Sequence, residues 1–140
     1  MKKFLTFSIL IINLLLCSAC GSDDKDEVVV QNLLIGTWDM EPNEYGDIYE
    51  MVFMENGRFI DNVIIDKQID DIFEGTYIIK ENIVTKNYLT HKERKGKSDQ
   101  WLEGVVEEGN KTFRFNIEGD KLTISSLNGT EKTILTRKKE

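Results

Sequence analysis

The sequence predicts an all-β protein: a small antiparallel up-and-down barrel of about eight strands, behind an N-terminal signal peptide. From residue 33 onward apolar and polar residues alternate, as they do in half-buried strands. Turn signals built from Gly, Asn and Asp separate these short runs. The chain has 140 residues, which is room for one domain. A sandwich is the alternative arrangement of so many short strands, whereas closure into a barrel would remove exposed sheet edges.

The predicted strands form hairpins whose turns carry their own signals. Asn56-Gly57 lies between two apolar runs and is the strongest of these signals, because both residues tolerate positive φ. Glu81-Asn82, Glu118-Gly119-Asp120 and Asn128-Gly129 mark further turns. Residues 63–72 are ambiguous, since this segment could also hold a helical turn. The predicted strands span residues 34–40, 48–54, 58–65, 73–80, 83–89, 101–107 (the weakest), 111–117, 121–126 and 131–137.

The first twenty residues have the order of a secretory signal: a positive Lys2-Lys3 start, an apolar stretch over 4–16, and small residues after it. The apolar stretch is too short to span a bilayer. The segment resembles a bacterial lipoprotein signal, on the strength of Ser18-Ala19 before Cys20, whereas Cys17 stands where Leu is usual. The resemblance implies cleavage before Cys20, acylation of its thiol with fatty acids such as palmitate, and membrane anchoring through it. The alternatives are a soluble secreted protein cut nearby and a retained N-terminal anchor.

Residues 21–31 begin with small and acidic side chains that have nothing to bury, which is typical of a flexible tether. Their acidic residues resemble the surface-export signal of Bacteroidota lipoproteins, which implies an outer-membrane protein exposed at the cell surface. A plain solvated spacer is the alternative, and it leaves the side of the membrane open. The predicted organisation is a signal peptide over 1–19, lipidated Cys20 with a flexible acidic tether over 20–31, and the barrel domain over 32–140.

Short motifs follow one another along the domain: Gly36 and Trp38; Phe53, Gly57 and Phe59; Gly75 and Tyr77; and Gly119, Asp120, Leu122 and Ile124. Their order resembles that of lipocalins, and more closely that of the small lipocalin-like domains of Bacteroidota lipoproteins. In lipocalins the Trp of the opening strand packs against an Arg from near the C-terminus, which implies that Gly36, Trp38 and Arg137 close one end of the barrel. The alternative is that Arg137 is an exposed tail charge.

The sequence carries no phosphate-binding loop, zinc-protease motif or serine-hydrolase elbow, so we expect no enzyme, no cofactor and no metal. The formal net charge of −7 argues against a nucleic-acid partner. His91 is the only histidine and falls in the polar segment 90–100, which indicates a solvated loop. A hydrolase that uses His91 with a carboxylate is therefore not favoured. The carboxylates at Asp61, Asp66, Asp70, Asp71 and Glu74 are interpreted as surface acidity.

The apolar face of the predicted strands leaves two hypotheses open. A lipid-anchored, monomeric envelope protein could bind a small apolar ligand inside the barrel. Alternatively, the barrel is filled, and the protein meets a protein or glycan through its outer surface and loops. Aromatic and Met content does not separate them, because both need a large apolar interior. The candidate ligand-binding residues are Tyr49, Met51, Phe53, Phe59, Tyr77, Phe113 and Phe115.

Overall fold

The protein is described by a computed structural model that covers residues 33–139 apart from 97–98, 105 and 107–108. The predicted signal peptide, Cys20 and most of the segment before the barrel lie outside these residues. Among the described residues, no helix is long and apolar enough to cross a membrane. The strands are β1 (Gly36–Met40), β2 (Ile48–Phe53), β3 (Arg58–Ile65), β4 (Gln68–Lys80), β5 (Ile83–Arg94), β6 (Trp101–Glu103), β7 (Asn110–Glu118), β8 (Lys121–Ser125) and β9 (Lys132–Arg137).

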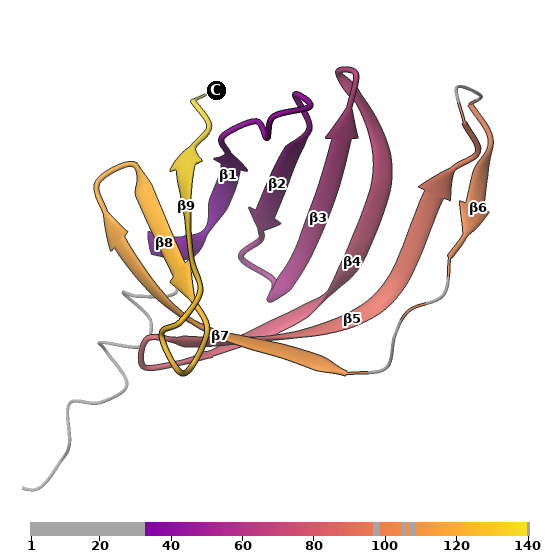
Figure 1. The fold of residues 1–140 in the computed structure, drawn as a ribbon. Coiled ribbons are helices and arrows are strands. Elements are labelled where there is room, and N and C mark those ends of the chain that lie inside the picture. Colours follow the sequence, from indigo (N-terminus) through magenta and orange to yellow (C-terminus); the bar gives the residue numbers. More distant parts are fainter. Residues whose placement is uncertain (1–32, 97–98, 105, 107–108, 140) are drawn as a thin grey trace, which may run out of the picture.

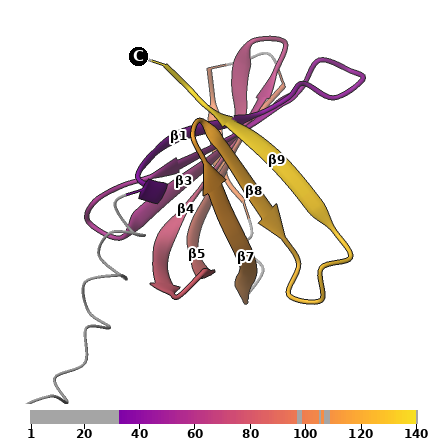
Figure 2. The ribbon, with the colours of Figure 1, turned by 90° about the vertical axis from the view of Figure 1, so that its left-hand side faces the viewer.

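Eight of these strands form a closed antiparallel barrel, which confirms the predicted fold class. Each strand from β1 to β5 pairs with the next along the chain, β7 pairs with β5 and β8, and β9 returns to β1. Figure 1 shows β9 lying beside β1, and Figure 2 shows that the strands are strongly tilted relative to one another around the barrel. The β1–β9 and β4–β5 pairings leave every strand of this ring with two neighbours, as closure of a sheet requires.

The sixth strand lies outside the ring. β5 pairs with β7 only over Ile83–Asn87, and its far end pairs instead with β6 over Lys92–Arg94. In Figure 1 this end of β5 runs away from β7 and forms a separate hairpin with β6. The expectation that 90–100 is a loop is wrong for its first half, because β5 continues to Arg94.

The ambiguous segment 63–72 contains a tight hairpin turn and no helical turn. β3 ends at Ile65, β4 starts at Gln68, and Asp66 and Lys67 join them with φ of 51° and 65°. Two consecutive residues with positive φ are the signature of a type I′ turn, whose twist suits paired strands. Asp66 and Lys67 have little preference of their own for positive φ. The pairing of β3 with β4 stabilises the turn instead.

Alternate residues of the strands point inward and form one apolar core. Full burial of a large apolar side chain contributes about 1.5–3 kcal/mol, so this set dominates the stability of the barrel. The buried core residues are Leu34, Trp38, Met51, Phe53, Phe59, Tyr77, Val84, Phe115, Leu122 and Leu135.

One end of the barrel is closed around Trp38, which is fully buried. The guanidinium of Arg137, its register partner on β9, lies 4.1 Å from the centroid of the indole. Arg137 also donates hydrogen bonds to the carbonyls of Leu33 (2.7 Å) and Ile35 (2.8 Å). Gly36 has a φ of 130°, and a Cβ there would come within 2.6 Å of the guanidinium, so glycine is required at this position.

We predict that Arg137→Leu lowers the free energy of unfolding by about 2–4 kcal/mol, because it removes a cation–π contact and two hydrogen bonds at once. Urea denaturation measures the change. Lys139→Ala is the control: its ammonium is 85% exposed and 3.7 Å from Asp120, so its loss should change stability by less than about 0.5 kcal/mol. An equal, small effect of both substitutions would contradict the closing role of Arg137.

Candidate functional site

A charged pair lies inside the barrel, between the apolar core and one of its ends. Asp61 on β3 is 0% exposed and Lys86 on β5 is 1% exposed. Both face inward, because Asp61 lies two residues after Phe59, and Lys86 lies two residues after Val84. Burying two charges has a large desolvation cost, which only close pairing and further hydrogen bonds can offset.

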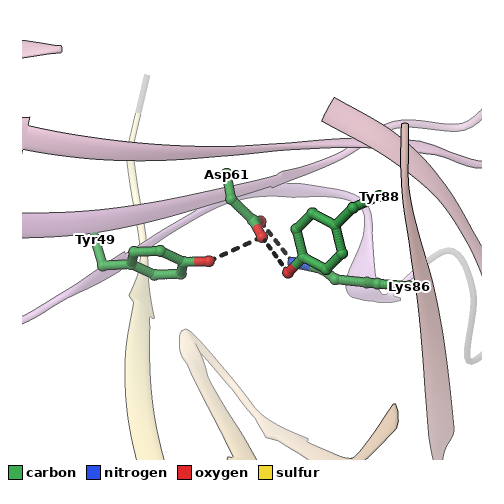
Figure 3. A network of polar contacts seen from close by, with 4 residues as sticks. All are labelled: Tyr49, Asp61, Lys86 and Tyr88. Atoms are coloured by element: carbon green, nitrogen blue, oxygen red, sulfur yellow. Dashed lines mark hydrogen bonds and ion pairs between the residues drawn. The ribbon is translucent and has the colours of Figure 1, made fainter. Parts of the chain in front are cut away.

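Three side chains donate to the carboxylate of Asp61: Tyr49 approaches from one side, and Lys86 and Tyr88 approach together from the other (Figure 3). The ammonium of Lys86 donates to one carboxylate oxygen at 2.5 Å. The hydroxyls of Tyr49 on β2 and Tyr88 on β5 donate to the other oxygen at 2.8 and 2.9 Å. We call these four residues the interior polar cluster. It joins strands β2, β3 and β5 through side chains alone.

Aromatic rings take the place of water around the ammonium of Lys86. Its Nζ lies 4.4 Å from the centroid of Phe59, 5.0 Å from that of Phe53 and 5.9 Å from that of Phe113. The negative faces of such rings attract a cation, most strongly where water is excluded. Burial lowers the pKa of Lys86, while the neighbouring Asp61 raises it and opposes this effect.

The environment also acts on the two phenols of the cluster. Burial raises the pKa of Tyr49 far above its ordinary value, and the negative charge of Asp61 adds to the effect. The pKa of Tyr88 is raised by the same two causes. Both hydroxyls therefore stay protonated and serve as hydrogen-bond donors to the carboxylate.

The inward-facing side chains beyond the cluster are only partly buried, which marks this end as the mouth of the barrel. Phe73 is half-buried, as are the two phenols. Tyr88 makes edge-to-face contacts with Phe59 at 4.9 Å and with Phe73 at 6.1 Å. The mouth thus has aromatic walls, and the interior polar cluster lies at its floor.

The seven predicted ligand-binding residues all face the interior, but the structure divides them between two levels. Tyr49 is half-buried at the mouth, whereas Phe113 is half-buried beside the core, in register with the fully buried Val84. Tyr77 belongs to the closed half, where its ring packs edge-to-face on Phe53 at 5.1 Å and its hydroxyl donates to the carbonyl of Met54. The five that are almost fully buried in the core are Met51, Phe53, Phe59, Tyr77 and Phe115.

Two sequence-based interpretations of polar residues are wrong. Asp61 is not surface acidity, because it is fully buried in its ion pair with Lys86. His91 is not a solvated loop residue: it lies on β5, its side chain is 14% exposed, and its Nε2 is 2.9 Å from Asp71. The sequence analysis missed Lys86 altogether. Period-two alternation was the available signal, since it places Asp61 and Lys86 on the inward faces of their strands.

A second cluster of charges lies on the outer face, where β1, β2 and β3 adjoin. Glu50 accepts hydrogen bonds from Asn62 at 2.8 Å and from Lys138 at 2.6 Å. Burial raises the pKa of Glu50, but these hydrogen bonds outweigh it and hold the pKa below its ordinary value. Burial raises the pKa of the neighbouring Asp39. The hydrogen bonds to Glu50 link β2 to β3 through Asn62 and to the segment after β9 through Lys138.

No family model, no curated protein and no solved structure matches the chain. The barrel and the two levels of its interior are therefore the features from which a function can be inferred.

We predict that Tyr49 makes stability fall at alkaline pH. In the unfolded chain its phenol ionises near 10.0, whereas in the folded barrel it stays protonated above that pH. The folded state then holds more protons, so this part of the stability is complete below pH 10 and is lost as pH rises beyond it. Tyr49→Phe should remove up to about 1.4 kcal/mol per pH unit from the slope above pH 10.

The measurement is the free energy of unfolding between about pH 9 and 11.5 in each variant. Tyr45→Phe is the matched control, because Tyr45 is 80% exposed. If Tyr45→Phe and Tyr49→Phe change the slope equally, the buried phenol does not have the proposed effect.

Proposed function

We propose that this protein is a non-enzymatic, lipocalin-like binding protein that takes a small, mainly apolar ligand into the mouth of its barrel. The observation that carries the proposal is the division of the interior. A packed apolar core fills the closed half, while the half-buried rings of Tyr49, Phe73 and Tyr88 lie in the other half beside the buried pair of Asp61 and Lys86. Concave, mostly apolar sites with a few convergent polar groups are typical of small-molecule binding.

The interior polar cluster supports binding more than it supports stability. Replacing a buried ion pair by well-packed apolar residues is often neutral or stabilising, so a barrel filled only for stability gains little from Asp61 and Lys86. The cluster does supply hydrogen-bonding groups at the base of the mouth. The hydroxyls of Tyr49 and Tyr88 donate to Asp61 and keep lone pairs that can accept from a ligand.

A second candidate function is docking of a partner on the outer surface, and the β5–β6 hairpin favours it. Leu89 is 55% exposed, Leu102 43% and Trp101 38%, all on or beside this hairpin outside the ring. Large exposed apolar side chains on a hairpin outside the ring are candidate contacts for a partner. In this case the barrel interior would be purely structural.

We predict that Phe113→Ala weakens ligand uptake, because Phe113 is a half-buried aromatic side chain of the interior, with its ring centroid 5.9 Å from the ammonium of Lys86. The protein is purified without delipidation, weighed by native mass spectrometry and extracted with organic solvent. The expected result is one co-purifying small molecule per barrel, at reduced occupancy in Phe113→Ala. Loss of one aromatic contact is expected to reduce affinity by about tenfold.

Ile78→Ala is the matched control, because Ile78 is 68% exposed on the outer side of β4 and loses apolar surface without touching the interior. Both variants are compared only after denaturation shows that they are folded. An apo mass for the unmodified protein, with no binding of added apolar probes, would contradict ligand binding and favour the surface hypothesis.

We further propose that lipid on Cys20 anchors the protein to the outer membrane, facing either the periplasm or the cell surface. The support is the lipoprotein-like order of charged, apolar and small residues before Cys20. The described chain begins at Leu33, whose carbonyl accepts a hydrogen bond from Arg137 at the closed end. An anchor that leads into this end would leave the mouth at the far side of the barrel, open to ligand.

We predict that Cys20→Ala abolishes acylation in cells, because the thiol of Cys20 is the proposed attachment point. Metabolic labelling with a radioactive fatty acid measures it. Cys17→Ala is the control and should still be labelled, since the proposed cut removes Cys17. Normal labelling of Cys20→Ala would disprove the lipoprotein hypothesis and leave the ligand hypothesis untouched.

A further inference from the structure

Three potential metal ligands meet at the rim of the barrel mouth. Asp71 on β4 pairs in register with Glu93 on β5, and Phe73 pairs with His91. One nitrogen of His91 and one carboxylate oxygen of each acid lie within 4.8 Å of one another. These residues come from two adjacent strands, so the backbone holds their relative positions.

The imidazole of His91 is fixed in one orientation. Its ring stacks on Phe73, with centroids 4.1 Å apart and an interplanar angle of 4°. Gly104 covers the opposite part of the ring: a Cβ at this position would overlap Nδ1, and its amide donates to the carbonyl of His91 at 2.9 Å. Nδ1 is thereby buried without a hydrogen-bond partner among the described residues. Nε2, 2.9 Å from Asp71, is the nitrogen that faces the carboxylates.

We propose that Asp71, His91 and Glu93 bind a divalent transition-metal ion of the zinc class. One imidazole and two carboxylates are a ligand set that such borderline ions accept, whereas magnesium and calcium prefer oxygen ligands alone. Ligands at about 2.0–2.2 Å from a tetrahedral ion lie roughly 3.3 Å apart, which small rotations of these side chains reach. A dication would also neutralise the two carboxylates.

The hydrogen bond between His91 and Asp71 explains why these two side chains meet. It does not explain why the carboxylate of Glu93 lies beside them, because Glu93 takes no part in that bond. Glu93 is exposed, and yet the strand register holds its carboxylate beside the other two groups. Three protein ligands leave at least one coordination position for water or for a ligand atom. The proposed ion would cross-link β4 and β5 at the rim, independently of whether the interior binds a ligand.

His91 is the only histidine of the chain, so its ring nitrogens give an unambiguous NMR signal. The full 140-residue chain is ¹⁵N-labelled, held in a zwitterionic detergent and purified without a polyhistidine tag. Cys17→Ser and Cys20→Ser are introduced so that no thiol competes for the metal. Zn²⁺ is titrated in, and we expect the Nε2 resonance to shift and saturate at one ion per chain. Mg²⁺ should leave it unchanged.

Substitution of each ligand identifies the site. Asp71→Asn and Glu93→Gln should each weaken Zn²⁺ binding by at least about tenfold in isothermal titration calorimetry. His91→Asn should abolish it. Asp70→Asn is the matched control, because Asp70 is the adjacent residue of β4 and points to the other face of the sheet. Glu93→Gln replaces an exposed side chain by one of equal size, so it tests the site even if the other two variants fail to fold.

Unchanged His91 signals at up to about 1 mM Zn²⁺ would overturn the proposal. Wild-type affinity in Glu93→Gln would overturn the three-ligand site as well. Neither result bears on ligand uptake by the mouth, which is measured in metal-free buffer.

Discussion

The pairing of β1 with β9 is the contact on which the barrel depends, because it closes the sheet between two ends of the domain. Ile35 and Arg137, joined there by a hydrogen bond, are 102 residues apart, so closure carries a large loss of chain entropy. The structure concentrates strong interactions at this place: a buried indole, a guanidinium stacked on it and two carbonyl acceptors. Once the seam is formed, every strand of the ring has two neighbours in the sheet.

Closure creates an interior in which side chains from non-adjacent strands meet. Asp61 on β3 reaches Lys86 on β5 past β4, and Gly75 lies on the inner face of the intervening strand. A side chain at Gly75 would overlap the carbonyl of Asn87 and the ring of Phe59. Instead its two register partners, Phe59 and Tyr88, pack directly on each other over the glycine. Thus one missing side chain permits both the aromatic contact and the ion pair beside it.

The strands and most turns could be predicted because their signals are local: alternation along each strand, and Asn-Gly or similar pairs between strands. The β3–β4 turn could not be predicted in this way. Asp66 and Lys67 take positive φ because the paired strands constrain them, whereas their own conformational preference does not lead to it. The candidate site was only half predictable. Its aromatic residues follow from composition and from alternation along the strands. Its ion pair does not, because a charged residue in a strand is usually solvated. Asp61 and Lys86 meet only because the folded barrel brings the inward faces of β3 and β5 together.

The charge balance of the interior polar cluster limits the ligand that the proposed function can involve. Asp61 and Lys86 neutralise each other, and the remaining members are hydroxyls, so the floor of the mouth carries no net charge. A charged head group placed there would be buried without a counter-charge, which is costly in a water-poor site. A neutral hydroxyl or amide group has no such penalty, and it can exchange hydrogen bonds with the two phenols. The proposed ligand is therefore an apolar molecule with a neutral polar end, while an ionic group would remain at the rim, where Asp71 and Glu93 lie.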